Sequence, residues 1–244
     1  MKPGKILIML SLFTIMVGCS TSSKLIIGNQ SPEKFQKEIK KNIEVNYLLY
    51  LPENYEQETK NYPLMLFLHG AGERGKNLQK VAIHGPAKLI KQGKKFPFII
   101  VSPQCSENQW WDIESLDLLL KDMSSQYRVD ENQIYLTGLS MGGYGTWAMA
   151  MEYPHRFAAI APICGGGNPV IAGKIKHLPT WVFHGAKDDV VPLKNSQDMV
   201  DALKETGGDV KFTIYPEAQH DSWTETYNNP ELYEWFLIHS RDSN

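Results

Sequence analysis

The chain has 244 residues, of which 42% are apolar and 21% are charged, and its formal net charge is −2 at pH 7. A chain of this length and apolar content can bury one sizeable core, so a single folded domain is expected. The small net charge and the lack of a run of like charges argue against a basic face, and no nucleic-acid partner is expected.

The N-terminal segment has the pattern of an export signal. Lys2 and Lys5 make its start basic, and residues 6–17 are predominantly apolar but too few to span a bilayer. The following Met16-Val-Gly-Cys19 resembles a bacterial lipobox, in which cleavage before the cysteine leaves that residue lipid-modified. The alternative is an ordinary signal that is cleaved within the next few residues.

These features predict three parts of the chain. We expect residues 1–18 to be a lipoprotein signal peptide, residues 19–34 a tether and residues 35–244 the folded domain. Lipid on Cys19 would anchor the exported protein to a bacterial membrane, on its periplasmic or cell-surface side. The sequence leaves the oligomeric state open.

Apolar runs alternate with helical stretches through most of the chain. Ile43–Leu51 alternates in polarity and predicts an antiparallel strand. Strands buried on both faces are predicted at residues 64–68, 98–101, 134–136, 158–163, 181–183 and 210–215. Helices are predicted at residues 78–92, 113–127, 142–152, 195–206 and 230–239. This alternation is typical of an α/β fold with a mostly parallel sheet.

One predicted strand meets one predicted helix at Gly138-Leu-Ser140-Met-Gly142. The G-x-S-x-G pattern between strand and helix indicates a nucleophile elbow, with Ser140 as the nucleophile. Glycines suit the positions where strand and helix approach most closely around a strained serine. The pentapeptide alone would also fit a glycine-rich turn with an uninvolved serine, so the interpretation depends on partner residues.

Four segments carry a resemblance to a known family. His69-Gly-Ala-Gly-Glu-Arg-Gly75, Ser102-Pro-Gln-Cys105, Gly138-Leu-Ser-Met-Gly-Gly143 and His220-Asp-Ser-Trp223 resemble secreted serine esterases of the α/β-hydrolase superfamily. The resemblance covers about residues 40–240 and lies near the dienelactone hydrolase and carbohydrate (feruloyl, acetyl xylan) esterase branches, including relatives labelled "predicted peptidase". It implies a central, mostly parallel sheet with helices on both faces. Residues 165–180 are too few for a sizeable lid domain.

A serine nucleophile needs a base, and the base needs an orienting carboxylate. In α/β-hydrolases the order along the chain is serine, acid, histidine. His220 follows the last predicted strand and is the candidate base, whereas His184 is expected to be structural. His184-Gly-Ala-Lys-Asp-Asp-Val-Val-Pro192 resembles the family motif H-G-x-x-D-x-x-V-P, whose acid falls on Asp188. Asp189 is the alternative acid.

The oxyanion hole requires two N–H donors that are fixed toward the forming negative charge. Met141, directly after the nucleophile, is expected to supply one donor. The family resemblance implies that Ala71 supplies the other. An ion pair between Glu73 and Arg74 is a hypothesis for what shapes the loop around Ala71.

Three tryptophans are candidates for substrate binding. Trp110, Trp111 and Trp223 lie on predicted loops at the carboxyl ends of strands, where their faces would suit sugar rings or aromatic acyl groups. The alternative is that they belong to the core. No metal-ligand spacing or phosphate-binding loop stands out, so no cofactor is expected.

Cys105 and Cys164 each follow a predicted strand. In the resembled fold these two strands are separated by two others, which puts the cysteines beyond disulfide reach. We therefore expect both thiols to be free.

Together these features predict a serine carboxylesterase that works through an acyl-enzyme. The expected substrates are acyl or feruloyl esters on plant polysaccharide, or related small esters. A serine peptidase of the same fold is one alternative. A surface carbohydrate-binding protein that has lost catalytic activity is the other.

Overall fold

The computed structural model describes residues 30, 32 and 34–241. Contacts divide the chain into residues 1–42 and residues 43–244, and the helices and strands of the described residues all lie in the second unit. The predicted signal peptide, Cys19 and most of the predicted tether lie outside the described residues and stay predictions. Within the described ranges, no helix has the length and apolar character needed to cross a membrane.

The core of the second unit is a seven-stranded sheet with the order β1-β3-β2-β4-β5-β6-β7. Its strands are β1 (Tyr47–Tyr50), β2 (Tyr62–Leu68), β3 (Ile99–Pro103), β4 (Val129–Leu139), β5 (Ala159–Ile163), β6 (Thr180–Gly185) and β7 (Val210–Tyr215). β1 pairs with β3 in the antiparallel sense, and all other pairs are parallel. The expected mostly parallel sheet with an antiparallel first strand is confirmed.

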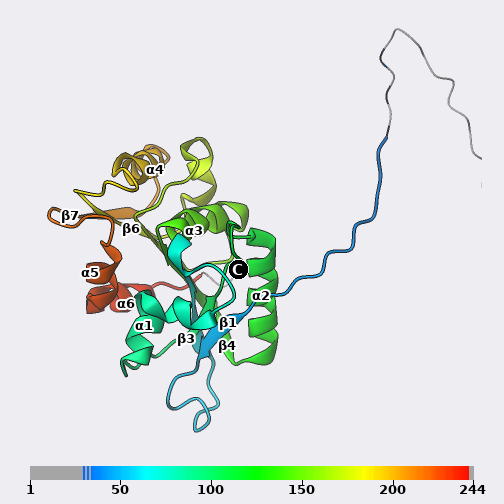
Figure 1. The fold of residues 1–244 in the computed structure, drawn as a ribbon, viewed down its shortest axis with the longest axis vertical. Helices are drawn as coiled ribbons and strands as arrows, with labels where there is room; N and C mark the ends of the chain where they lie inside the picture. The colour runs from blue at the N-terminus through cyan, green and yellow to red at the C-terminus, as the bar shows by residue number, and fades with distance from the viewer. Residues whose placement is uncertain (1–29, 31, 33, 242–244) are drawn as a thin grey trace, which may run out of the picture. The chain divides into compact units, whose positions relative to one another are not determined.

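Helices cover both faces of this sheet (Figure 1). They are α1 (Gly85–Lys91), α2 (Ile113–Gln126), α3 (Met141–Glu152), α4 (Lys194–Glu205), α5 (Trp223–Asn228) and α6 (Pro230–Leu237). α2, α3 and α4 contribute Leu120, Trp147 and Met199 to one core, and α1, α5 and α6 contribute residues such as Phe236 to the other. Burial from both sides is why the inner strands are continuous apolar runs.

β2 shows how one strand serves both cores. Leu64, Leu66 and Leu68 belong to the core under α2, α3 and α4, whereas Met65 and Phe67 belong to the core under α1, α5 and α6. Side chains alternate across a strand, so every second residue faces the same layer of helices.

The structure corrects two predicted elements. The helix expected at residues 78–92 is a 3₁₀ helix, Leu78–Ile83, followed by α1. His84 lies between them, Gly85 begins α1 with φ of 65°, and Pro86 suits the first turn of a new helix. Trp223, expected on a loop, is the first residue of α5, whose six mostly polar residues have no apolar period to reveal a helix.

The expectations about the separation of two strands, the free cysteines and the lack of a sizeable lid are confirmed. β3 and β5 are separated by β2 and β4, and Cys105 and Cys164 are both free. The segment between β5 and β6 contains only a 3₁₀ helix, Pro169–Ile175, so no sizeable lid covers the carboxyl end of the sheet there.

Candidate active site

The turn between β4 and α3 holds Ser140 in an unusual conformation, with φ of 52° and ψ of −116°. The two motif glycines allow this turn to close. A Cβ on Gly138 would lie 2.4 Å from the carbonyl oxygen of Gly142, and a Cβ on Gly142 would lie 2.0 Å from the carbonyl oxygen of Leu68. Because both obstacles are backbone atoms, neither position can accept a side chain without moving the chain.

Three side chains from separate loops meet at this turn. His220 Nε2 lies 2.9 Å from the Ser140 hydroxyl oxygen, and His220 Nδ1 lies 2.8 Å from Asp188 Oδ2. The carboxylate can only accept, so Nδ1 carries the proton and Nε2 accepts from the serine hydroxyl. The Asp188 side chain is 0% exposed and the His220 side chain is 19% exposed. Part of the imidazole is therefore accessible to solvent, whereas the Asp188 carboxylate is not.

The Asp188 carboxylate is fixed independently of His220. Its Oδ1 accepts the N–H groups of Val190 at 3.0 Å and Val191 at 2.8 Å. Asp189 is exposed, and the hydrogen bond of His220 Nδ1 is to Asp188. Of the two alternatives left open by the sequence, the structure therefore places Asp188 beside His220.

His184 is a buried neighbour of this carboxylate, with Nε2 at 3.2 Å from Asp188 Oδ2 and 2.9 Å from the carbonyl oxygen of Val191. Two acceptors at one nitrogen require that Nε2 carry the proton. Nδ1 lies 2.8 Å from the Ser196 hydroxyl oxygen, and that hydroxyl donates to the carbonyl oxygen of Gly165 at 2.7 Å. Burial lowers the pKa of His184. His184 thus helps to orient Asp188, in agreement with its expected structural role.

The loop after β2 is organised by His69, which is fully buried. Its Nδ1 donates to the carbonyl oxygen of Gly70 at 2.6 Å, and its Nε2 accepts the Cys105 N–H at 3.0 Å. Burial lowers the pKa of His69 to about 4, which is consistent with a ring that accepts at one nitrogen. The ring joins the loops that follow β2 and β3, a role that the sequence did not reveal.

Both expected oxyanion donors are the first residues of helices. Ala71 begins the 3₁₀ helix Ala71–Glu73 and Met141 begins α3, so both N–H groups fall outside the intrahelical hydrogen bonds. The proposed Glu73–Arg74 ion pair is wrong. Glu73 instead accepts the Gly70 N–H at 2.9 Å, and Arg74 Nε donates to the carbonyl oxygen of Ala71 at 2.9 Å.

Two of the three tryptophans line one pocket of about 500 Å³, which we call the tryptophan pocket. Trp110 is 65% exposed and Trp111 is 9% exposed, and Tyr144 of α3 lines the same pocket. The Tyr144 N–H donates to the carbonyl oxygen of Ser140 at 3.0 Å, and the Trp111 ring centroid lies 4.7 Å from that of His69. The pocket is thereby connected to both the elbow and the loop after β2.

Trp223 lies apart from the tryptophan pocket. Its ring meets His220 edge-on with centroids 5.1 Å apart, and its Nε1 donates to His84 Nδ1 at 3.3 Å. The three tryptophans therefore do not line a single cleft. Trp223 packs against the back of the candidate base, where it limits the orientations open to the imidazole.

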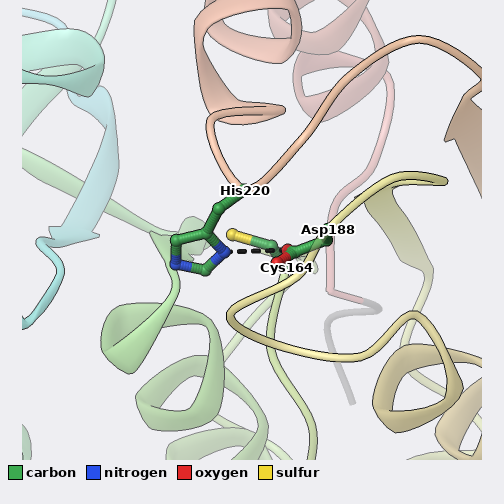
Figure 2. A group of neighbouring side chains, drawn as sticks. All are labelled: Cys164, Asp188 and His220. Carbon is green, nitrogen blue, oxygen red and sulfur yellow. Dashed lines mark hydrogen bonds and ion pairs between the residues drawn. The ribbon is translucent and has the colours of Figure 1, made fainter.

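Cys164 is a further residue at this site that the sequence analysis did not assign to it. It follows β5 directly, is fully buried and has φ of 40°. Its sulfur lies 3.3 Å from the Ser140 nitrogen, and a sulfur, a carboxylate oxygen and a ring nitrogen of Cys164, Asp188 and His220 lie within 4.8 Å of one another (Figure 2). The sequence offered one signal for this placement, because Cys164 directly follows β5, the strand next to β4.

Comparison with known proteins finds a hydrolase family and several esterases among the relatives of this chain. The model of the Dienelactone hydrolase family matches residues 106–233. The bifunctional acetylxylan esterase/xylanase XynS20E of Neocallimastix patriciarum is 29% identical over 202 residues, which cover 77% of this chain and 27% of that protein. Probable feruloyl esterase C of Aspergillus terreus is 23% identical over 167 residues, which cover 66% of this chain and 62% of that protein.

A solved structure also resembles the chain closely. The crystal structure of a thermostable esterase superposes with a TM-score of 0.73 at 36% sequence identity, covering 84% of this chain and 62% of that one. The fold is therefore the α/β-hydrolase fold. The chain spans only part of the length of each of these relatives.

Proposed function

Because the chain belongs to the dienelactone hydrolase family, we propose that it is a serine carboxylesterase that hydrolyses esters through an acyl-enzyme. The observation that carries this proposal is the continuous hydrogen-bonded chain from Ser140 through His220 to Asp188. Such a chain lets a serine hydroxyl lose its proton as it attacks, which it does poorly alone.

The proposed reaction follows from the proton positions. Ser140 attacks the ester carbonyl while His220 Nε2 takes the hydroxyl proton, and Asp188 stabilises the resulting imidazolium. The N–H groups of Ala71 and Met141 stabilise the oxyanion. His220 then protonates the departing alcohol, and a water molecule that gives its proton to His220 releases the acid.

We propose that the tryptophan pocket receives the aromatic or sugar part of the substrate. Trp110 presents an exposed ring, and its edge-to-face partner Tyr144 lies 6.0 Å away between centroids. Trp111 adds a largely buried ring to the lining of the same pocket. Relatives named as acetylxylan and feruloyl esterases support an acyl or feruloyl ester of plant polysaccharide.

The test is a comparison of substrates with the purified full chain. We expect hydrolysis of p-nitrophenyl acetate, methyl ferulate and acetylated xylan, and much slower cleavage of a p-nitroanilide. Trp110→Ala should raise KM for methyl ferulate roughly 2- to 10-fold, the worth of an aromatic contact, and leave p-nitrophenyl acetate unaffected. Anilide turnover equal to ester turnover would favour the peptidase, and sugar binding without hydrolysis would favour the binding protein.

We further propose that the protein is exported and lipid-anchored through Cys19. The support is the sequence pattern of residues 1–19, with a basic start, an apolar stretch and a lipobox-like end. Expression of the full chain in a bacterium fed radiolabelled palmitate should label the protein and place it in the membrane fraction. Cys19→Ala should abolish the label, whereas an equally labelled Cys19→Ala variant would contradict the proposal.

A further inference from the structure

We propose that Cys164, Asp188 and His220 form a binding site for a thiophilic divalent cation such as Zn²⁺ or Cd²⁺, and that its occupation switches the hydrolase off. Their sulfur, carboxylate oxygen and ring nitrogen lie within 4.8 Å of one another. Figure 2 shows the three side chains converging, with the sulfur directed toward the imidazole. The inference goes beyond the proposed ester hydrolysis, which has no use for the thiol.

The donor set suits this class of metal. Thiolate, imidazole and carboxylate are the zinc ligands of proteins, and three of them plus one exchangeable position make a complete tetrahedral site. Tetrahedral bonds of the usual lengths put neighbouring donor atoms about 3.3–3.6 Å apart. His220 Nδ1 and Asp188 Oδ2, now 2.8 Å apart, would have to move slightly apart to reach this spacing. The Cys164 sulfur, which lies within 4.8 Å of both atoms, would have to move closer to them.

The surroundings already hold two of the ligands in place. The two backbone N–H groups on Asp188 Oδ1 leave Oδ2 directed at the cluster. The Cys164 N–H is bound to the carbonyl oxygen of Phe183 at 2.9 Å, which fixes the cysteine at the end of β5. Such supporting hydrogen bonds orient metal ligands in known sites.

The Ser222 hydroxyl lies at the same place. It is fully buried, and its hydrogen-bond partner in the described part of the chain is the Cys164 sulfur, which is a weak acceptor. A buried hydroxyl with so weak a partner is costly, and a metal-bound thiolate would accept its hydrogen bond more strongly than the neutral thiol does.

Metal binding would remove the catalytic base by moving the proton of the His220 ring from Nδ1 to Nε2. In the metal-free site Nδ1 carries the proton and Nε2 accepts from Ser140. A cation on Nδ1 requires that nitrogen to be unprotonated, so the ring proton relocates to Nε2 through solvent and the thiol proton leaves to solvent. Nε2 then donates to the Ser140 hydroxyl instead of accepting from it, and the serine keeps its proton.

The thiol does not disturb the metal-free enzyme. Cys164 is fully buried, and burial disfavours the charged form of a thiol that has no cation beside it. A bound thiophilic cation replaces the thiol proton, as metals do at cysteine sites. The same three residues can therefore serve the resting triad and the metal site in turn.

The experiment compares the full chain with two matched cysteine variants. Cys164→Ser removes the proposed ligand, and Cys105→Ser changes the other free buried cysteine of the described residues. Each is assayed for ester hydrolysis with increasing ZnCl₂, relative to its own zinc-free rate, with MgCl₂ as the control salt. Each is also titrated with CdCl₂ while the ultraviolet charge-transfer band of a cadmium thiolate is followed.

We expect ZnCl₂ to inhibit the full chain and Cys105→Ser equally, and chelation to restore both rates. Loss of a mere hydrogen-bond partner of a ligand typically costs about 10–100-fold in metal affinity, so Cys164→Ser should raise the half-inhibiting zinc concentration at least tenfold. The cadmium band of Cys164→Ser should be smaller than that of Cys105→Ser. Cys164→Ala provides the same comparison if the serine variant does not fold.

Equal zinc sensitivity and equal cadmium bands in both cysteine variants would overturn the proposal, as would an unmodified chain that zinc does not inhibit. Zinc inhibition depends on ester hydrolysis, whereas the cadmium band does not, so the metal site and the proposed function can fail separately. A chain that hydrolyses no ester contradicts the esterase, while its cadmium band still reports whether Cys164 binds metal.

Discussion

At the scale of single residues, the site depends on hydrogen bonds that fix the role of each polar atom. The Asp188 Oδ1 accepts two backbone N–H groups, which leaves Oδ2 for His220 Nδ1 and commits Nε2 to Ser140. The family motif was enough to prefer Asp188 over Asp189. It could not reveal that the neighbouring backbone holds the carboxylate in place, because that depends on how the loop folds.

The two adjacent aspartates give a matched pair of variants. Asp188→Asn should lower kcat by about 10⁴-fold, because the amide favours the wrong histidine tautomer, whereas exposed Asp189→Asn should change kcat less than about twofold. Steady-state hydrolysis of p-nitrophenyl acetate measures both. A large loss with Asp189→Asn and a small one with Asp188→Asn would reverse the assignment.

At the scale of elements, the strand–turn–helix unit of β4 and α3 was predictable because its constraints are local. The glycine spacing and the strand-then-helix pattern fall within one short stretch of sequence. Trp223 was misplaced because α5 is short and polar. Ser140, Cys164 and Asp188 come together because they follow the neighbouring strands β4, β5 and β6. That strand order is not revealed by one sequence without the family resemblance.

The elbow glycine Gly142 should tolerate no side chain. Gly142→Ala would place Cβ 2.0 Å from the Leu68 carbonyl oxygen, so we expect a loss of about 3 kcal/mol in the free energy of unfolding, at the upper end for overpacking. Gly72→Ala is the control, because its Cβ would meet nothing within 4 Å, and it should change stability by less than about 0.5 kcal/mol. Urea unfolding measures both, and equal effects would contradict the close-approach argument.

At the scale of the whole molecule, the fold brings together loops from several parallel strands at the carboxyl edge of one sheet. The apolar runs predicted most strands because helices bury both faces. The polar beginning of β4 and the break at Gly85 escaped prediction because tertiary contacts and one positive φ decided them. The same burial leaves several histidines neutral inside the fold.

This burial predicts sensitivity to acid. The pKa of His69 is about 4 in the folded chain, against 6.5 for an ordinary histidine, so between these pH values the unfolded chain binds more protons and stability falls as pH falls. The loss from His69 alone is about 3 kcal/mol when both states are protonated. Burial also lowers the pKa of His84 and His184, which adds to the loss in the same direction.

Urea unfolding of the full chain at several pH values between 7 and 4 measures this loss. His69→Gln should flatten the dependence on pH, whatever it does to stability at pH 7. His155→Gln changes an exposed histidine and should leave the dependence as it is. A slope that His69→Gln does not reduce would show that His69 is not the buried neutral group described above.

The most direct test of the central claim is the rate at which the full chain and Ser140→Ala release p-nitrophenol from p-nitrophenyl acetate. We expect ready hydrolysis by the full chain and a fall in kcat of about 10⁴-fold or more in Ser140→Ala, with an unchanged circular dichroism spectrum. Equal hydrolysis by the two proteins would show that Ser140 is not the nucleophile, and the proposed serine esterase would be wrong.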